Sequence, residues 1–179
     1  MRKLIRNVLV LGAMSFTLFG CNQSKSDDIS YNEFKTIAEE DLQKECNYTS
    51  VTINGKMTVV LGETEVKDRT LKMTGRNIDT SSFDKTDLNA YVVNEMIATV
   101  INDGASIKIF TSADYSSQGL KYYKEPLKVD SGESEITDNN NRSVVGLMTF
   151  DDYALPTKLD ATIKTSGTTM KMNITLSYK

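Results

Sequence analysis

The feature that most restricts the fold is a two-residue alternation of apolar and polar side chains near the C-terminus. Apolar residues occupy every second position on both sides of Ser166-Gly167: Leu159, Ala161 and Ile163 before the pair, and Met170, Met172, Ile174, Leu176 and Tyr178 after it. Successive side chains of a strand lie on opposite faces of the sheet, so a two-residue period puts all the apolar residues on one face. A Ser-Gly pair between two such runs is typical of a turn. The segment is therefore predicted to be an antiparallel hairpin with one apolar face.

Further strands are predicted upstream of this hairpin. One run alternates over residues 51–61, and Gly55 lies on its apolar side, which indicates a bend or bulge. A turn at Gly62-Glu63 leads to a second strand that is weak in the middle, with apolar residues at Val66, Leu71 and Met73. We expect shorter strands over residues 105–111, 120–129 with a break at Pro126, and 144–150, and a long polar loop over residues 130–142.

Two helices are predicted, one before the strands and one between them. Ser30 and Glu33 match a capping box, and an apolar stripe with helical spacing follows them at Tyr31, Phe34, Ile37, Ala38 and Leu42. The second helix opens at Thr86-Asp87 and runs to Asn102. Its apolar residues spread over a wide arc, so we expect it to be covered on more than one side.

These elements predict an α+β domain over residues 30–179, with seven or eight mainly antiparallel strands. The order of elements, together with the Leu155-Pro156 entry to the last hairpin, resembles the LolA-like and LppX-like lipoprotein carriers. The resemblance implies a curved, mainly antiparallel sheet or incomplete β-barrel with a leading helix and one inserted lid-like helix. In that group the concave face holds acyl chains.

The N-terminus has the parts of a secretory signal. Arg2, Lys3 and Arg6 form a positive region, and an uncharged apolar run follows from Val8 to Phe19. Leu18-Phe19-Gly20-Cys21 resembles the lipobox of bacterial lipoproteins, although Phe19 replaces the small residue usual there. The resemblance implies a signal peptide over residues 1–20, a diacylglyceryl group on Cys21 and a polar tether over residues 21–29, which places the protein on the extracytoplasmic face of a cell membrane. The alternative is an uncleaved signal anchor in which Cys21 has no role.

Charge and cysteine content limit the possible partners and chemistry. Loss of Arg2, Lys3 and Arg6 with the signal reduces the 21 basic residues to 18 against 24 acidic ones, a net charge of −6, so we expect no nucleic-acid partner and a monomer. With Cys21 acylated, Cys46 has no disulfide partner, and the chain has no histidine to activate it. Cys46 is either a small half-buried apolar residue, which we favour, or a nucleophile.

The sequence lacks the residue patterns that common catalytic sites require. Besides histidine, the chain lacks a cysteine pair, a glycine-rich phosphate loop and a G-x-S-x-G motif. We interpret the carboxylate pairs Asp151-Asp152 and Glu63 with Glu65 as solvated charge rather than as a glycosidase pair. The expectation is a protein that is not an enzyme and has no metal or cofactor.

Two functional hypotheses of different class remain. The first is a carrier or sensor of a lipid or other apolar ligand, whose candidate ligand face is rich in methionine: Met57, Val59, Met73, Met96, Met148, Met170, Met172 and Ile174. A candidate aromatic rim consists of Tyr115, Tyr122 and Tyr123. The second is a surface adhesion or assembly module without a ligand cavity, in which the same methionines only fill the core. An enclosed apolar void would favour the first hypothesis and a filled core the second.

Overall fold

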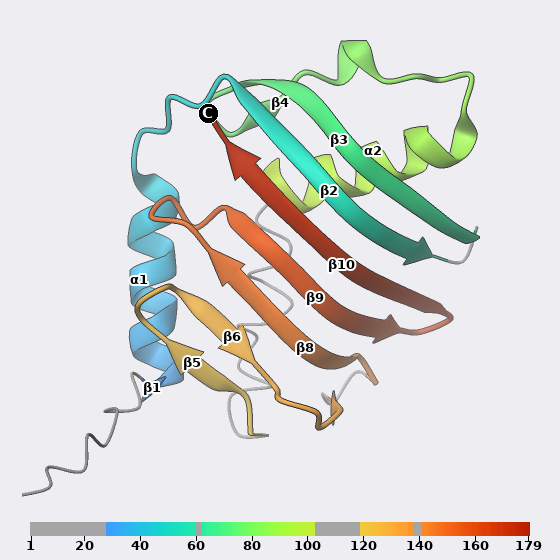
Figure 1. Ribbon diagram of the computed structural model, residues 1–179. Helices are drawn as coiled ribbons and strands as arrows, with labels where there is room; N and C mark the ends of the chain where they lie inside the picture. The colour runs from blue at the N-terminus through green and yellow to red at the C-terminus, as the bar shows by residue number, and fades with distance from the viewer. Residues whose placement is uncertain (1–27, 60–61, 103–118, 138–140) are drawn as a thin grey trace, which may run out of the picture.

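A sheet dominates the described part of the molecule, and all of its strands except β1 (Asp28–Ile29) follow the first helix. The computed structural model describes residues 28–59, 62–102, 119–137 and 141–179, so Cys21, Tyr115 and the strand expected over residues 105–111 lie outside the described residues. Within them, every strand pair is antiparallel and the sheet is open, in the order β1-β5-β6-β8-β9-β10-β2-β3-β4 with β7 beside β8 (Figure 1). The predicted α+β class, with a mainly antiparallel, unclosed sheet and two helices, is confirmed.

The described residues form two α-helices, one short 3-10 helix and ten strands. The strands are β1 (Asp28–Ile29), β2 (Ser50–Val59), β3 (Gly62–Thr74), β4 (Asn77–Ile78), β5 (Lys121–Tyr123), β6 (Lys128–Asp130), β7 (Ile136–Thr137), β8 (Ser143–Phe150), β9 (Pro156–Thr165) and β10 (Thr168–Tyr178). The helical elements are α1 (Tyr31–Gln43), η1 (Thr80–Ser82) and α2 (Leu88–Asn102).

The C-terminal hairpin lies at the centre of the sheet. Its strands β9 and β10 pair from Thr165 and Thr168 outward around Ser166-Gly167, and the apolar side chains of both strands lie on one buried or half-buried face. The other side of β10 pairs with β2, which comes more than a hundred residues earlier in the chain. This long-range pairing joins the two strongest alternating patterns into one apolar face.

A bulge explains the weak middle of β3. Across β2 and β3, Ile53 pairs with Arg69 but Gly55 pairs with Val66, so β3 contains one more residue than β2 between these pairs. Asp68 takes up the extra residue with a φ of 46°, and its backbone N–H donates to the Asn54 side chain at 2.6 Å. The bulge turns Val66 and Leu71 to the same buried face although their spacing is odd. The irregularity predicted beside Gly55 is present, but the extra residue lies in β3 rather than in the strand that contains Gly55.

Helix α1 begins as the capping box predicts. Ser30 has an extended backbone, and its hydroxyl accepts the Glu33 N–H at 3.2 Å. Phe34 is fully buried, with its ring 5.2 Å from that of Tyr122 on β5 and 6.2 Å from that of Phe150 on β8. Helix α1 therefore packs at the β5 end of the sheet (Figure 1).

Helix α2 lies behind β2 and β3, near the opposite end of the sheet (Figure 1). Asp87 caps it, because its carboxylate accepts the N–H groups of Asn89 at 3.1 Å and Ala90 at 3.2 Å. The helix contacts β3 and β4. Its buried residues form one broad face of the helix: Val93, Asn94, Ile97, Ala98, Val100 and Ile101.

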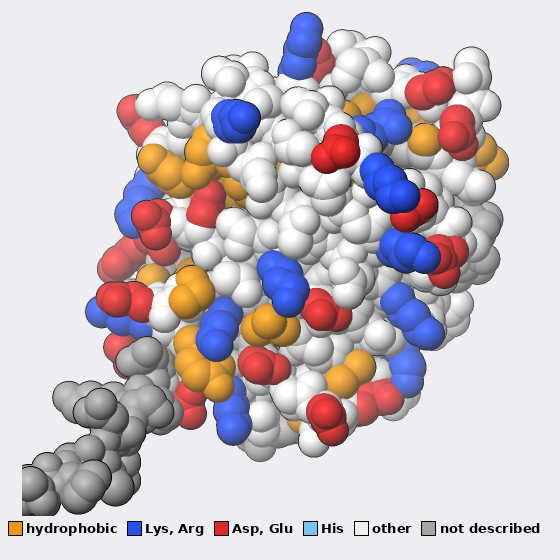
Figure 2. All heavy atoms as spheres, in the orientation of Figure 1, with side chains coloured by type: hydrophobic (Ala, Val, Ile, Leu, Met, Phe, Trp, Pro, Cys, Tyr) orange, Lys and Arg blue, Asp and Glu red, His pale blue; other side chains and the backbone are white. Residues whose placement is uncertain are grey.

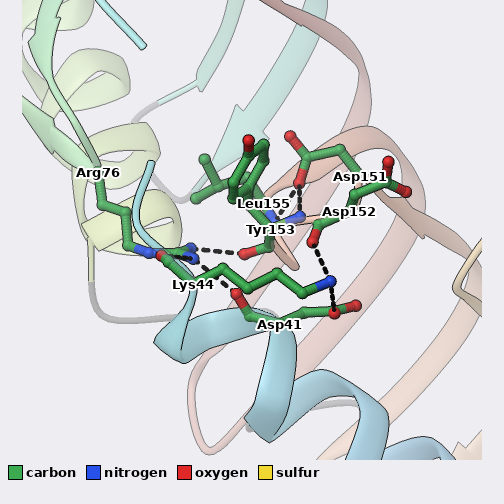
Figure 3. Close-up of polar contacts among 7 residues, drawn as sticks. All are labelled: Asp41, Lys44, Arg76, Asp151, Asp152, Tyr153 and Leu155. Carbon is green, nitrogen blue, oxygen red and sulfur yellow. Dashed lines mark hydrogen bonds and ion pairs between the residues drawn. The ribbon is translucent and has the colours of Figure 1, made fainter. Parts of the chain in front are cut away.

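A polar junction fastens the C-terminal end of α1 to two loops (Figure 3). The Arg76 guanidinium, from the turn between β3 and β4, donates to the carbonyl oxygens of Tyr153 at 2.5 Å, Asp41 at 2.7 Å and Lys44 at 3.3 Å. Asp41 is buried and forms an ion pair with Lys44 at 2.5 Å, which raises the pKa of that lysine. The junction satisfies carbonyl groups that a helix end leaves without partners.

The Asp151-Asp152 pair is not simply solvated charge. The Asp151 carboxylate accepts the N–H groups of Tyr153 at 2.9 Å and Leu155 at 2.8 Å, and the Tyr48 hydroxyl at 2.9 Å. Asp152 is exposed and offers its carbonyl to Lys44 at 3.2 Å. Asp151 therefore organises the loop that leads into the last hairpin, and the interpretation as solvated charge is wrong for this residue.

Two further expectations differ from the structure. The strand expected over residues 120–129 is two paired strands, β5 and β6, with Pro126 in the turn between them, and the loop over residues 130–142 contains β7. Asp28 and Ile29, expected at the end of a polar tether, pair with Tyr123 and Tyr122 of β5. In each case a short strand is stabilised by its neighbour in the sheet rather than by its own pattern.

Candidate functional site

The structure brings four residues of the proposed ligand face together in the centre of the sheet. Met57 of β2 lies directly opposite Met172 of β10, and Ile174 of β10 lies opposite Leu159, which in turn lies opposite Met148 of β8. Met57, Met148, Met172 and Ile174 are 0 to 3% exposed. They form one continuous apolar patch on the helix-bearing face and belong to the main core.

The remaining residues of that proposed face lie towards its margins. Met73 is buried where β3 pairs with Ile78 of β4. Val59, Met170 and Met96 are half-buried and pack against the same core. The proposed ligand face is therefore continuous and buried in its centre, and three of its marginal residues are partly exposed to solvent.

The proposed aromatic rim is not a single cluster. Tyr122 and Tyr123 are consecutive residues of β5, so their side chains lie on opposite faces of the sheet. Tyr122 is buried against Tyr31 and Phe34 of α1, whereas Tyr123 is half-buried with the Lys128 ammonium 4.0 Å from the centre of its ring. The structure thus assigns Tyr122 to the core and Tyr123 to the outer surface.

A different site lies between β3 and α2. We call it the β3–α2 cleft; it has a volume of about 370 Å³ and is lined by Thr64, Glu65, Val66, Lys67, Arg69, Asp87, Ala90, Val93 and Asn94. Thr64 and Val66 project from the inner face of β3, and Glu65 and Lys67 project from its outer face. Because both faces of β3 line the cleft, it opens along the edge of that strand.

Asn94 is the unusual residue of the β3–α2 cleft. Its side chain is 0% exposed, and neither its amide nitrogen nor its amide oxygen has a hydrogen-bond partner among the residues that the structure describes. A buried polar group without a partner costs about 1–3 kcal/mol, and such groups are rare in native structures. Val66 and Val93 are apolar residues of the same cleft lining. Asn94 is thus a lining residue of the cleft whose buried amide has unused donor and acceptor capacity among the described residues.

The edge of β3 beside the cleft also has unused hydrogen-bonding capacity. On the side away from β2, β4 pairs only with Met73 and Thr74, and no strand among the described residues pairs with residues 62–71. In an antiparallel strand, alternate residues direct their N–H and C=O groups to each side. Half of the backbone groups of this stretch therefore point towards the side on which the cleft opens.

The charges around the cleft balance. Glu65 forms an ion pair with Lys67 at 3.1 Å, and both side chains are largely exposed. Asp87 is engaged in capping α2, and Arg69 lies close enough to Asp84 to help lower the pKa of that carboxyl, although hydrogen bonds from Thr86 are the main cause. With two acidic and two basic residues in its lining, the cleft favours a ligand without a large net charge.

A second hollow lies on the outer face of the sheet, over β2, β8, β9 and β10. It has a volume of about 420 Å³, and its lining includes Lys56, Glu63, Gly146, Asp160 and Lys171. Lys56 pairs with Glu63 at 2.8 Å, which lowers the pKa of Glu63. Figure 2 shows this face with basic and acidic side chains interspersed. Its best-placed charges already have partners, so we take the β3–α2 cleft as the candidate site.

Sequence reasoning missed both parts of this site. The available signal for Asn94 was a single amide inside the apolar stretch from Tyr91 to Ile101. The sequence carries no signal for the free edge, because the two-residue length of β4 is a feature of the structure alone.

Comparison with known proteins gives no assignment: no family model, no curated protein and no solved structure matches this chain. Within the described residues, none of the helices has the length and apolar character needed to cross a bilayer.

Proposed function

We propose that this chain is a lipid-anchored, extracytoplasmic interaction module that binds a partner at the β3–α2 cleft. The observation that carries the proposal is the Asn94 amide, which is buried in the lining of an open cleft and has no hydrogen-bond partner within the described part of the chain. A bound partner that satisfies this amide would recover the free energy that its burial costs. The lipobox resemblance at Leu18 to Cys21 supports the membrane location.

The anchor is tested by labelling cells with a radioactive fatty acid. The wild-type protein and a Cys46→Ala variant are expected to incorporate label, and a Cys21→Ala variant is expected to lose it, because Cys21 is the proposed acylated thiol. The two variants are matched controls, since the chain contains only these two cysteines. Equal label on Cys21→Ala would contradict the lipoprotein assignment.

The cleft is tested by site-specific photo-cross-linking in cells. A photoreactive amino acid at Ala90, in the lining of the cleft, is expected to give a discrete cross-linked product, and the same group at Lys171 on the outer face is not. Adding Asn94→Leu to the Ala90 variant is expected to remove that product. A product that forms equally from both positions, or that persists with Asn94→Leu, would contradict binding at the cleft.

The apolar-ligand carrier remains a second candidate because of the contiguous patch formed by Met57, Met148, Met172 and Ile174. Under this hypothesis α2 is a lid that moves when a lipid or acyl chain enters. The purified protein is then expected to carry lipid and to bind a fluorescent fatty-acid probe, and Met96→Glu on α2 is expected to weaken that binding while circular dichroism shows that the variant stays folded. Wild-type protein that is folded, lipid-free and unable to bind the probe would remove this candidate.

A further inference from the structure

We infer that the partner bound in the β3–α2 cleft is an extended polypeptide segment, which adds to the free edge of β3 as a further strand. This inference rests on the function proposed above and specifies the chemical class of the partner. Its two supports are independent of each other: among residues 28–59, 62–102, 119–137 and 141–179, no strand pairs with the outer edge of β3 over residues 62–71, and no group pairs with the amide of Asn94.

The edge of β3 supplies the main-chain contacts. Strand addition to an exposed sheet edge is a recurring mode of peptide recognition, in which main-chain hydrogen bonds give affinity and pockets for alternate side chains give specificity. Residues 62–66 precede the bulge and belong to one regular ladder with β2. At about 3.3 Å per residue these five residues span roughly 17 Å, which accommodates a partner strand of about five residues.

The bulge limits what can bind. Exposed edges carry a risk of uncontrolled pairing, which proteins reduce with bulges and charged side chains. Asp68, with its φ of 46°, interrupts the edge, and Glu63, Glu65 and Lys67 are charged. These features oppose the growth of a long intermolecular sheet, but they leave residues 62–66 available to a short segment.

The Asn94 amide matches a peptide group. It offers N–H donors and a carbonyl acceptor in one plane, and a backbone peptide group offers the complementary acceptor and donor. Val66, Val93 and the small Ala90 belong to the same cleft lining, so the cleft suits a partner segment with a small apolar side chain. The balanced charges of the lining suit an uncharged stretch of chain.

The experiment uses the purified lipoprotein in detergent micelles and a phage-displayed library of random ten-residue peptides. We expect selection to yield peptides that bind with one site per protein molecule. Methylating alternate peptide nitrogens is expected to weaken binding about tenfold for each main-chain hydrogen bond removed, and methylating the intervening nitrogens is expected to have little effect. Hydrogen exchange is expected to show added protection at residues 62–66.

Asn94→Leu separates a binding role from a structural one. It replaces an unpartnered amide by an apolar side chain of similar size, so the thermal midpoint is expected to stay the same or rise while peptide affinity falls about tenfold. Lys171→Ala, on the outer face, is the matched control and is expected to leave affinity unchanged. A fall in the midpoint with Asn94→Leu, or unchanged peptide affinity, would overturn the role assigned to the amide.

The remaining outcomes distinguish the two proposals. If no selected peptide protects β3, or if binding is insensitive to the pattern of methylation, strand addition is wrong, whereas an Asn94-dependent cross-link from Ala90 would still support the cleft as a binding site. If the protein alone forms dimers that Asn94→Leu dissociates, the occupant is a second copy of this chain and the inference of a separate partner is wrong.

Discussion

Removing the Arg76 guanidinium tests whether one side chain holds α1 to the rest of the domain. Arg76 donates to three carbonyl oxygens, two of them in the last residues of α1 and its C-cap and one in the loop between β8 and β9 (Figure 3). In Arg76→Ala these carbonyls lose a charged donor that water can replace only in part, because Arg76 and Tyr153 are half-buried and Asp41 is buried.

The expected loss of stability follows from these contacts. Hydrogen bonds to charged groups contribute about 1.5–3 kcal/mol each, and partial access of water reduces the sum for three of them to about 3 kcal/mol. For a domain of this size, 1 kcal/mol corresponds to about 2–4 °C in thermal midpoint, so Arg76→Ala is expected to lower the midpoint by about 6–12 °C. Arg76→Lys keeps the charge without the planar fork of donors, and we expect it to lose about half as much.

The assay is denaturant and thermal unfolding followed by circular dichroism, with Lys72→Ala as the control. Lys72 is an exposed lysine of β3, and its removal is expected to change stability by less than about 0.5 kcal/mol. An Arg76→Ala variant as stable as Lys72→Ala would show that the junction does not anchor α1, and an Arg76→Lys variant equal to wild type would show that the fork geometry is unimportant.

Two further predictions concern the sheet and the tyrosines. Met172→Ala is expected to cost about 2–5 kcal/mol because Met172 is buried opposite Met57, whereas the exposed neighbour Lys171→Ala is expected to cost less than about 0.5 kcal/mol, and equal denaturant midpoints would contradict the register of β10. Burial raises the pKa of Tyr178, whose hydroxyl donates to the Pro156 carbonyl at 2.7 Å, and burial and the hydrogen bond to Asp151 raise the pKa of Tyr48. Because the fold favours the neutral phenols, their stabilisation is complete below the unfolded pKa of about 10 and is lost as the pH rises through the folded values. In an alkaline titration, ultraviolet absorbance should therefore show a group of tyrosines that ionises only as circular dichroism is lost; ionisation of every tyrosine near pH 10 in a folded protein would refute this.

The free edge and the amide of the candidate site illustrate what a sequence leaves open. A single asparagine in an apolar helix signals that something polar is buried, but it does not say whether another part of the chain supplies a partner. That depends on which strand lies beside α2, and here the neighbouring strand is β3, whose inner face offers Thr64 and Val66 to the cleft. The site forms where α2 lies beside β3, so neither the sequence pattern of the helix nor that of the strand predicts it alone.

The sequence by itself determined the local elements. The alternation around Ser166-Gly167 specified the last hairpin and its buried face, the capping residues Ser30 and Asp87 specified where both helices begin, and Gly55 marked where the pairing of β2 and β3 is irregular. These features depend on side chains within a few residues of one another, so their physical causes can be recognised in a short stretch of chain. Only the tertiary structure decided that β10 pairs with β2, that Ile29 joins the sheet beside Tyr122, that Arg76 reaches the end of α1 and that Asn94 is buried with no partner among the described residues. A periodic pattern states which face of an element is apolar but not which other element covers it, because that choice depends on the packing of the whole chain around one core.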